Sequence, residues 1–273
     1  MLKSTIENVR EISPLIHNIT NYVTVNDVAN IILACGASPI MADDSEEVED
    51  ITSVCTALNI NIGTLNRNTI PSMILAGKKA NELNHPTVLD PVGVGASALR
   101  NKTAKELLEN VKFSVIRGNV SEIKFLATGI GAGKGVDAAV GDAVTEENLD
   151  SMVEFAKSFA KETGSIIAIT GAIDLVADAE RCFVIRNGRA EMGKITGTGC
   201  QLSGLIASFI AANQDNMLEA TAAAVIDMGL SGEIGWSNME KTDGNSTYRN
   251  RIIDAIYNMD GNKLEEGAKF EIK

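Results

Sequence analysis

The sequence contains few aromatic residues and little positive charge. Only 4% of its 273 residues are Phe, Trp or Tyr, and 36 acidic residues against 24 basic ones give a net charge of −12. The Lys and Arg residues are scattered along the chain, so the sequence offers no basic surface that could follow a phosphate backbone. We therefore expect no nucleic acid partner.

The sequence also lacks the signatures of membrane segments and of cysteine pairs. The uncharged stretch 29–42 contains Asn30 and Pro39 and is too short to span a bilayer. Residues 1–20 lack a basic region followed by an apolar core, so we expect no secretion signal, no membrane association and a cytoplasmic protein. None of the four cysteines has CxxC spacing, which argues against a zinc site and against a disulfide framework.

What the sequence does contain is an alternation of short β-rich runs with helical patterns. The predicted strands cover residues 15–19, 38–42, 59–65, 87–92, 113–117, 166–170 and 182–186. The predicted helices lie near residues 4–13, 22–35, 45–57, 68–83, 101–110, 120–127, 145–162, 200–213, 217–237 and 241–258. This alternation predicts an α/β fold with a mostly parallel central sheet and helices on both faces. Because no linker or repeat interrupts it, we expect a single domain over residues 1–273.

Ligands of such folds bind beyond the carboxyl ends of the strands, so the loops there hold the first candidate residues. In H-N-I-T-N, at 17–21, Asn18 and Asn21 could hydrogen-bond a small polar ligand, although Asn21 could equally cap the next helix. His17 is more typical of a structural histidine. In S-P-I-M-A-D, at 38–43, Met41 fits both a core position and a soft wall for a heteroaromatic ring.

Two further loops carry acidic side chains. In V-L-D-P-V-G-V-G-A, at 88–96, Asp90 could hold a metal ion or its water, or could cap a turn. In I-R-G-N-V-S-E-I, at 116–123, Asn119 and Glu122 have the spacing of a capping box. Acidic groups beside Arg117 are also what a magnesium nucleotide requires, because the arginine balances phosphate charge. Both interpretations stay open.

A glycine-rich segment, G-I-G-A-G-K-G-V-D at 129–137, resembles a phosphate loop only superficially. Thr128 stands where the first glycine of G-x-x-x-x-G-K-[ST] belongs, and Gly135 follows the lysine. We expect it to be a flexible connection.

The segment G-K-I-T-G-T-G-C-Q, at 193–201, leads directly into an apolar helical pattern. Gly197 and Gly199 would let several backbone N–H groups point at one spot, where the helix dipole also favours an anion. Cys200 begins the helix. Because cysteines at helix N-termini usually have a lowered pKa, we expect thiolate character and a functional role for Cys200.

These motifs together resemble the hydroxyethylthiazole kinases of the ribokinase-like superfamily. The matching motifs are G-T-G-C at 197–200, R-G-N-V-S-E at 117–122, D-P-V-G-V-G-A at 90–96, H-N-I-T-N at 17–21 and K-G-V-D at 134–137. In most of the superfamily the turn ends in aspartate, G-x-G-D, whereas the thiazole kinases have cysteine. The resemblance covers residues from near 10 to at least 240 and implies a three-layer fold with no separate lid domain.

The resemblance also implies an activity and the residues that serve it. The activity is ATP-dependent phosphorylation of the primary alcohol of 4-methyl-5-(2-hydroxyethyl)thiazole, a salvage step toward thiamine, in a homotrimer with sites at the subunit contacts. The implied residues are Cys200 for catalysis, Met41, Gly197 and Asn18 for the thiazole, Arg117 and Thr170 for ATP, and Asp90 and Glu122 for Mg²⁺ and its water.

Two other functions fit parts of this pattern. One is a different small-molecule kinase of the same superfamily, such as a hydroxymethylpyrimidine kinase. The other is a metabolite sensor that has lost its chemistry with the missing aspartate. The sensor explains Cys200 alone and leaves the acidic and basic groups of the other loops without a purpose.

Overall fold

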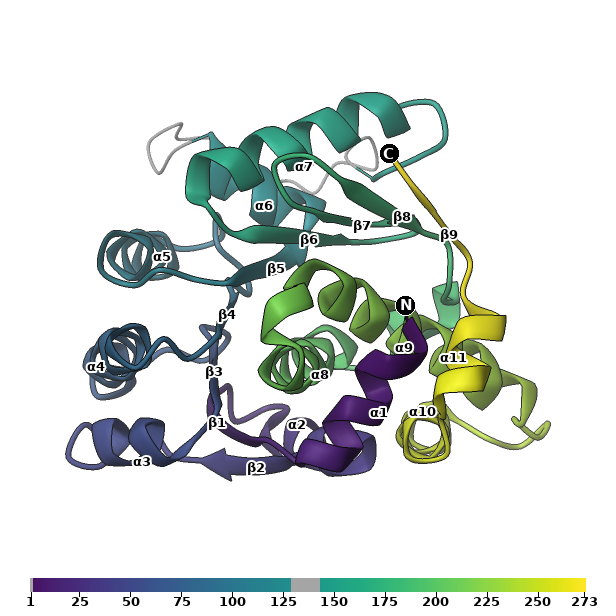
Figure 1. Ribbon diagram of the computed structural model, residues 1–273, viewed down its shortest axis with the longest axis horizontal. Coiled ribbons are helices and arrows are strands. Elements are labelled where there is room, and N and C mark those ends of the chain that lie inside the picture. The colour runs from purple at the N-terminus through teal and green to yellow at the C-terminus, as the bar shows by residue number, and fades with distance from the viewer. Residues whose placement is uncertain (1, 129–142) are drawn as a thin grey trace.

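The computed structural model describes residues 2–128 and 143–273, which form one nine-stranded sheet between two layers of helices (Figure 1). The strand order is β2-β1-β3-β4-β5-β6-β7-β8-β9, parallel from β2 to β6 and antiparallel from β6 to β9. The strands are β1 (Leu15–Ile19), β2 (Ser38–Met41), β3 (Ala57–Asn61), β4 (Thr87–Asp90), β5 (Val115–Asn119), β6 (Ile166–Thr170), β7 (Asp174–Ala177), β8 (Cys182–Ile185) and β9 (Phe270–Ile272).

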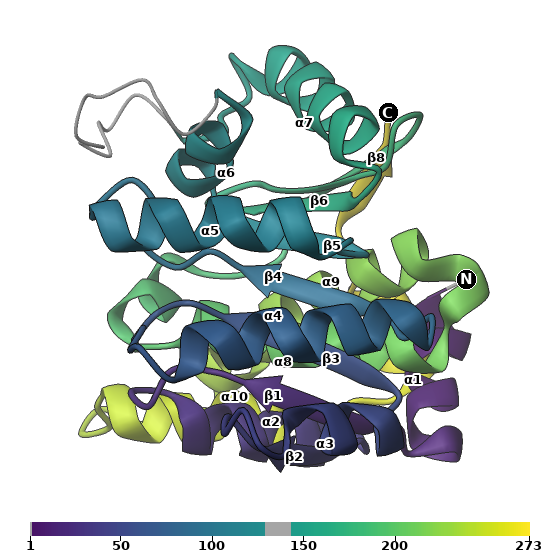
Figure 2. The same ribbon diagram turned by 90° about the vertical axis from the view of Figure 1, so that its left-hand side faces the viewer.

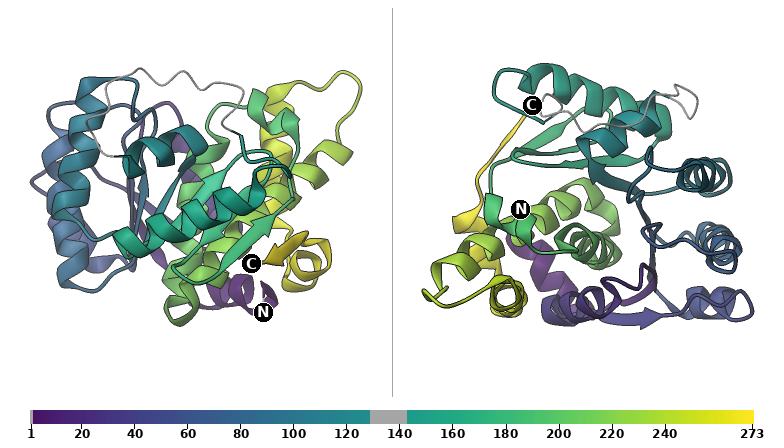
Figure 3. Two further views of the ribbon diagram at one scale, coloured as in Figure 1. Left: turned by 90° about the horizontal axis from the view of Figure 1, so that it is seen from above. Right: turned by 180° about the vertical axis from the view of Figure 1, so that it is seen from behind.

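Helices cover both faces of the sheet. They are α1 (Leu2–Ile12), α2 (Val25–Cys35), α3 (Val48–Val54), α4 (Thr69–Glu82), α5 (Ala98–Asn110), α6 (Val120–Ala127), α7 (Leu149–Thr163), α8 (Thr198–Ala212), α9 (Met217–Ser237), α10 (Asn245–Tyr257) and α11 (Gly261–Gly267), with two 3₁₀ turns at Ala190–Lys194 and Gln214–Asn216. The helices α3 to α5 lie side by side on one face (Figure 2), and α8 and α9 lie against the other, with α10 and α11 outside them (Figure 3).

Successive residues of the central strands belong to two different apolar cores, one on each face of the sheet. On β4, Val88 belongs to the core under α8 and α9, while Leu89 belongs to the core under α4 and α5. Val115 and Ile116 divide in the same way on β5. A strand buried on both faces needs apolar residues in succession, which is why these segments read as short continuous runs. The predicted α/β architecture with a mostly parallel sheet is confirmed.

The predicted elements differ from the observed ones at short or irregular segments. The strand predicted at 59–65 lies at Ala57–Asn61, and the strand predicted at 113–117 lies at Val115–Asn119. The sequence analysis missed β7, β9 and α11, because antiparallel strands of three or four residues and a seven-residue helix carry too few residues to show a period. The glycine-rich segment 129–137 lies outside the described residues.

The carboxyl ends of the parallel strands and the N-terminus of α8 meet at one edge of the sheet. The register pairs Asn61 at the end of β3 with Asp90 at the end of β4, and Asn119 at the end of β5 with Thr170 at the end of β6. Helix α8, which packs against β1, β3 and β4, begins at Thr198, within the G-T-G-C segment. In the part of the chain that the structure describes, no helix is long and apolar enough to cross a membrane.

Candidate active site at the carboxyl edge of the sheet

The two glycines of the G-T-G-C turn are required for different reasons. Gly197 precedes the first residue of α8 with φ of 86°, a left-handed conformation that favours glycine, and a Cβ there would overlap the side chain of Thr24. A Cβ on Gly199 would lie 2.5 Å from Nη1 of Arg117. The turn therefore lets the guanidinium group lie directly against the backbone at the start of α8.

Cys200 lies in the first turn of α8, buried among polar side chains. Nδ2 of Asn21 donates a hydrogen bond to its Sγ over 3.2 Å. Burial raises the pKa of the thiol above its usual value, the charge of Asp90 raises it further, and hydrogen bonds from Thr24, Asn61 and Asn21 oppose the rise. The expected lowering of this pKa was wrong, because loss of solvation outweighs the position at a helix N-terminus. Cys200 is a thiol at neutral pH.

Asp90 is fully buried, and its two oxygens differ. Oδ2 accepts hydrogen bonds from Nδ2 of Asn61 and Oγ of Ser203, both at 2.8 Å, and lies 3.5 Å from Nη1 of Arg117. Oδ1 is buried without a hydrogen-bond partner. Burial outweighs the attraction of Arg117 and raises the pKa of Asp90 to about 6. Its observed partners are Asn61 and Ser203, on another strand and on α8, so they give no support to a turn-capping role.

Glu122 joins two loops of the same edge. It forms the predicted capping box with Asn119, in which Glu122 Oε2 accepts the N–H of Asn119 at 2.8 Å. Its other oxygen, Oε1, accepts the N–H of Gly93 at 2.8 Å. The capping interpretation is confirmed, and the second bond ties the Asp90 loop to the start of α6. The negative charge of Glu122 also contributes to the raised pKa of Asp90.

Arg117 and Thr170 line a cavity of about 470 Å³ beside the G-T-G-C turn. Nη2 of Arg117 donates a 2.7 Å hydrogen bond to Oγ1 of Thr170. Thr198 and Gly199 of the turn line the same cavity. The cavity is large enough for a nucleotide, and its wall joins an arginine to the unpaired N–H groups of a helix N-terminus, which favours an anion.

A smaller cavity of about 170 Å³ lies beyond the ends of β1, β2 and β3. It is lined by Asn18, Met41 and Asn61 among others, while Gly197 does not line it. Asn18 is already bonded, because its Nδ2 donates to the carbonyl of Ile16 and its Oδ1 accepts from Asn59. The amides of Asn18 and Asn61 are thus both occupied, and the cavity offers a ligand the thioether of Met41 and, among its other lining side chains, Oγ1 of Thr20, which is buried without a hydrogen-bond partner.

His17, by contrast, has the structural role that the sequence favoured. It is fully buried, and its ring nitrogens lie 2.9 Å from Oγ1 of Thr52 and 2.9 Å from the carbonyl oxygen of Ala42. Both polar atoms are satisfied inside the protein.

The structure adds two polar residues, Asn61 and Ser203, that the sequence analysis did not assign to the site. Asn21, considered there as a ligand-binding residue or a helix cap, accepts the N–H of Thr24 just before α2 and also donates to Asn61 and Cys200. Asn61 was hidden because the predicted strand ran past it to residue 65. Ser203 could have been found, since it lies one turn after Cys200 on the same helix face.

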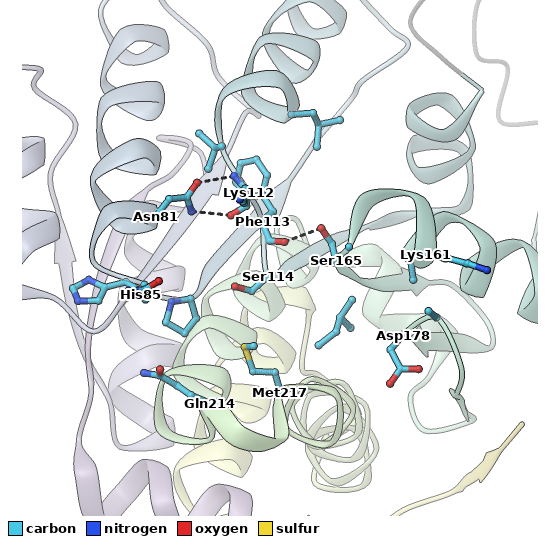
Figure 4. A pocket seen from close by; sticks show the side chains of 18 of the residues that line it. Asn81, His85, Lys112, Phe113, Ser114, Lys161, Ser165, Asp178, Gln214 and Met217 are labelled. Atoms are coloured by element: carbon cyan, nitrogen blue, oxygen red, sulfur yellow. Dashed lines mark hydrogen bonds between the residues drawn. The ribbon is translucent and has the colours of Figure 1, made fainter.

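A larger cavity, of about 1140 Å³, lies at the opposite edge of the sheet (Figure 4). Two of its polar side chains bind backbone groups: Asn81 exchanges two hydrogen bonds with Lys112, and Ser165 donates to the carbonyl of Phe113. These bonds hold the amino ends of the strands together. This cavity therefore adds nothing to the candidate site.

Comparisons with known proteins agree with the motifs. The model of the hydroxyethylthiazole kinase family matches residues 6–262. The chain is 63% identical over 271 residues to hydroxyethylthiazole kinase of Clostridium acetobutylicum, covering 99% of both chains. It resembles the solved structure of the hydroxyethylthiazole kinase protein from Pyrococcus horikoshii with a TM-score of 0.88 and 33% identity, over 100% of this chain and 98% of that one.

A more distant likeness shows the fold alone. A ribokinase-like superfamily protein from Enterococcus faecalis aligns with a TM-score of 0.60 and 12% identity, over 93% of this chain and 88% of that one. The three-layer fold implied by the motifs is thus confirmed as ribokinase-like. The matches to the family model and to relatives over the whole length show that this chain belongs to the hydroxyethylthiazole kinase family.

Proposed function

We propose that this protein transfers the γ-phosphoryl group of ATP to the primary alcohol of 4-methyl-5-(2-hydroxyethyl)thiazole, a step toward thiamine. The observation that carries the proposal is that the smaller cavity and the nucleotide-sized cavity meet at one hydrogen-bonded set of side chains. Asn61 lines the first cavity, Arg117 lines the second, and Asp90 contacts both residues.

Each of the two cavities would hold one of the two substrates. The thiazole ring would pack on Met41 in the cavity that Asn18 also lines. The ATP phosphates would lie against Arg117, Thr170 and the N–H groups at the start of α8. Phosphoryl transfer passes through a loose transition state, so positioning and charge stabilisation supply most of the catalysis.

Asp90 and Glu122 would organise Mg²⁺ through its water molecules. The buried, unpartnered Oδ1 of Asp90 fits this role, because a hard cation takes carboxylate and water oxygens. When bound, Mg²⁺ would neutralise charge on the ATP phosphates. Glu122 would act mainly by holding the Asp90 loop in place, since each of its oxygens already accepts a backbone N–H.

Cys200 would orient the substrate hydroxyl, and its thiolate form would accept the hydroxyl proton late in the transfer and so become the thiol. Burial and Asp90 raise the pKa of this thiol, which lowers the thiolate fraction at neutral pH. A loose transition state suits such a residue, because little negative charge develops on the attacking oxygen and proton transfer contributes only modestly to the rate.

A homotrimer with sites at the subunit contacts is part of the proposal, as is a cytoplasmic location. Tyr22, which lines the mouth of the smaller cavity, is 79% exposed, and its neighbour Val23 is 58% exposed. A second copy of the chain would cover these apolar groups and close the cavity. Sedimentation equilibrium on the purified protein tests the trimer directly.

The decisive experiment for the function is the release of ADP with and without the thiazole alcohol. Activity that requires this alcohol supports the proposal. Preference for hydroxymethylpyrimidine would identify a different kinase of the superfamily, and binding of the alcohol without ADP release would identify a sensor.

We expect Glu122→Gln to reduce magnesium-dependent turnover by more than about tenfold, because an amide accepts through only one oxygen and so releases either Asn119 or Gly93. The lost cap should also cost about 0.5–2 kcal/mol of stability. Turnover and thermal melting are measured on the same samples.

Ser97→Ala is the matched control for that change. Ser97 caps the neighbouring helix α5 by accepting the N–H of Arg100, but it brings no carboxylate to the site. It should lower the melting temperature by a similar amount with turnover nearly unchanged. If Glu122→Gln behaves like this control, Glu122 is a helix cap and nothing more.

We expect Met41→Ala to raise the KM for the thiazole alcohol by about tenfold, since the lost apolar contact is worth about 1–2 kcal/mol. The KM for ATP should change less than about twofold. Met152→Ala, in the core under α7, controls for general loosening of the fold. Equal changes in both KM values would mean that Met41 only fills the core.

A further inference from the structure

Asn61 occupies the centre of the hydrogen-bonded set between the two cavities. It is the last residue of β3, it is 1% exposed, and β3 lies between β1 and β4 in the sheet. Asp90 is its register partner on β4, and Asn21 lies in the loop that follows β1. Asn61 is thus placed to contact both the group beside Cys200 and the acidic group on the nucleotide side.

The orientation of both carboxamides is fixed by backbone donors. Oδ1 of Asn61 accepts the N–H of Gly63 at 2.9 Å, so its Nδ2 must be the group that donates to Asp90. Oδ1 of Asn21 accepts the N–H of Thr24 at 3.1 Å, so its Nδ2 must donate to Oδ1 of Asn61 and to the sulfur of Cys200. Because a backbone N–H can only donate, neither amide can flip without losing a bond.

This chain of bonds decides which oxygen of Asp90 is available. Asn61 and Ser203 both donate to Oδ2, and Arg117 lies on the same side, which leaves Oδ1 buried without a partner. If the donor on Asn61 is lost, Oδ2 keeps only Ser203 and the ion pair with Arg117, so the orientation of the carboxylate is less firmly held. The same residue, through Asn21, holds an N–H group on the sulfur.

We propose that Asn61 is a positioning residue that fixes the proton acceptor, Cys200, and the carboxylate of Asp90 relative to each other by binding Asn21 on one side and Asp90 on the other. The inference rests on the proposed function. The effect of Asn61 is on the alignment of Cys200 and Asp90, to which phosphoryl transfer is sensitive.

The first test is a comparison of kinetic constants. Asn61→Ala should lower kcat on the order of 10²-fold, as expected for misalignment of reacting groups. Both KM values should stay within about threefold of the parent, because neither binding surface is removed. If this variant does not fold, Asn61→Ser keeps a hydrogen-bonding group for the N–H of Gly63 and replaces it.

Asn213→Ala is the control for loss of a buried asparagine. Asn213 is buried at the end of α8, donates to the carbonyls of Thr5 and Phe209, and accepts from Asn8. It should lower the melting temperature while kcat stays within about twofold, as for most changes away from a site. A purely structural Asn61 would match this control, and the proposal would then be wrong.

The second test uses the Cys200→Ala background to separate the effects of the two hydrogen bonds of Asn61, one with Asn21 and one with Asp90. Without the sulfur, Asn21→Ala should lower kcat by less than Asn61→Ala does, because its remaining partner in the site is Asn61, which Gly63 and Asp90 also hold. Asn61→Ala should still lower kcat by at least about tenfold through Asp90. An Asn61→Ala effect that vanishes in this background would overturn the two-sided role.

The parent protein separates this inference from the function on which it rests. A parent that fails to release ADP with the thiazole alcohol contradicts the proposed function. A fully active parent whose Asn61 variants keep their kcat contradicts only the role of Asn61.

Discussion

Gly199→Ala is expected to lose on the order of 10²-fold or more in kcat/KM for ATP while the protein remains folded. Gly199 lies in the first turn of α8, where alanine is a better helix former than glycine. Its Cβ, however, would lie 2.5 Å from Nη1 and 2.6 Å from Nη2 of Arg117. The guanidinium group must therefore move away from the turn, and with it a cation that faces the phosphates.

A double-mutant cycle tests this cause. If the added methyl group acts by displacing Arg117, then Gly199→Ala should have little further effect in an Arg117→Ala background. Gly244→Ala, at an open position before α10, should leave both stability and turnover nearly unchanged. A full loss that persists without the arginine would instead mean that the nucleotide itself needs the bare backbone at Gly199.

This contact also shows what could be predicted from the sequence. The pattern G-T-G-C before an apolar helix indicated a tight turn at a helix N-terminus, and the structure has it, with α8 starting at Thr198. That Gly199 makes room for an arginine 82 positions earlier could not be predicted, because the contact depends on how β5 and α8 pack. The turn could be predicted from neighbouring residues, whereas the contact between two segments far apart in the sequence could not.

The same division holds for the polar residues of the site. Asp90 and Glu122 were identified because they follow strands and have motif spacing. Asn61 was not named, and Asn21 was left open between binding a ligand and capping a helix, since an asparagine at a strand end or before a helix fits either role. Only the register between β3 and β4 brings Asn61 to Asp90.

The predicted lowering of the Cys200 pKa was wrong for a related reason. The sequence shows the helix N-terminus, which lowers a thiol pKa, but it does not show the burial and the neighbouring Asp90 that raise it.

The expectation of one domain over residues 1–273 stays a prediction.

The second prediction with a large expected effect concerns Cys200, whose raised pKa bears on the kcat expected for each variant. Cys200→Ala should lose on the order of 10–10³-fold in kcat, with the N–H groups of the turn and Arg117 sustaining the rest. Cys200→Ser should fall between the alanine variant and the parent, because a hydroxyl still hydrogen-bonds the substrate but is scarcely basic. Cys200→Asp should remain an active kinase, at least as fast as the parent.

The aspartate variant is expected to work because the ordinary pKa of an aspartate, about 3.9, lies well below that of a cysteine, about 8.5. Burial and the charge of Asp90 raise the pKa of the Cys200 thiol and would raise that of a carboxyl at position 200 in the same direction. A larger fraction of the carboxyl than of the thiol would therefore be ionised at neutral pH. Any rate advantage of the variant comes from this larger ionised fraction, because a carboxylate is a weaker base than a thiolate.

The pH dependence distinguishes these roles. Between pH 6 and 9, kcat of the parent should rise with pH as thiolate forms, by less than about tenfold per unit because a loose transition state needs little base strength. The kcat of Cys200→Asp should rise less with pH than that of the parent, since an aspartate carboxyl ionises at lower pH than a thiol. Substrate binding is measured separately for all four proteins. An inactive aspartate variant beside a fully active alanine variant would show that Cys200 only fills space at the start of α8.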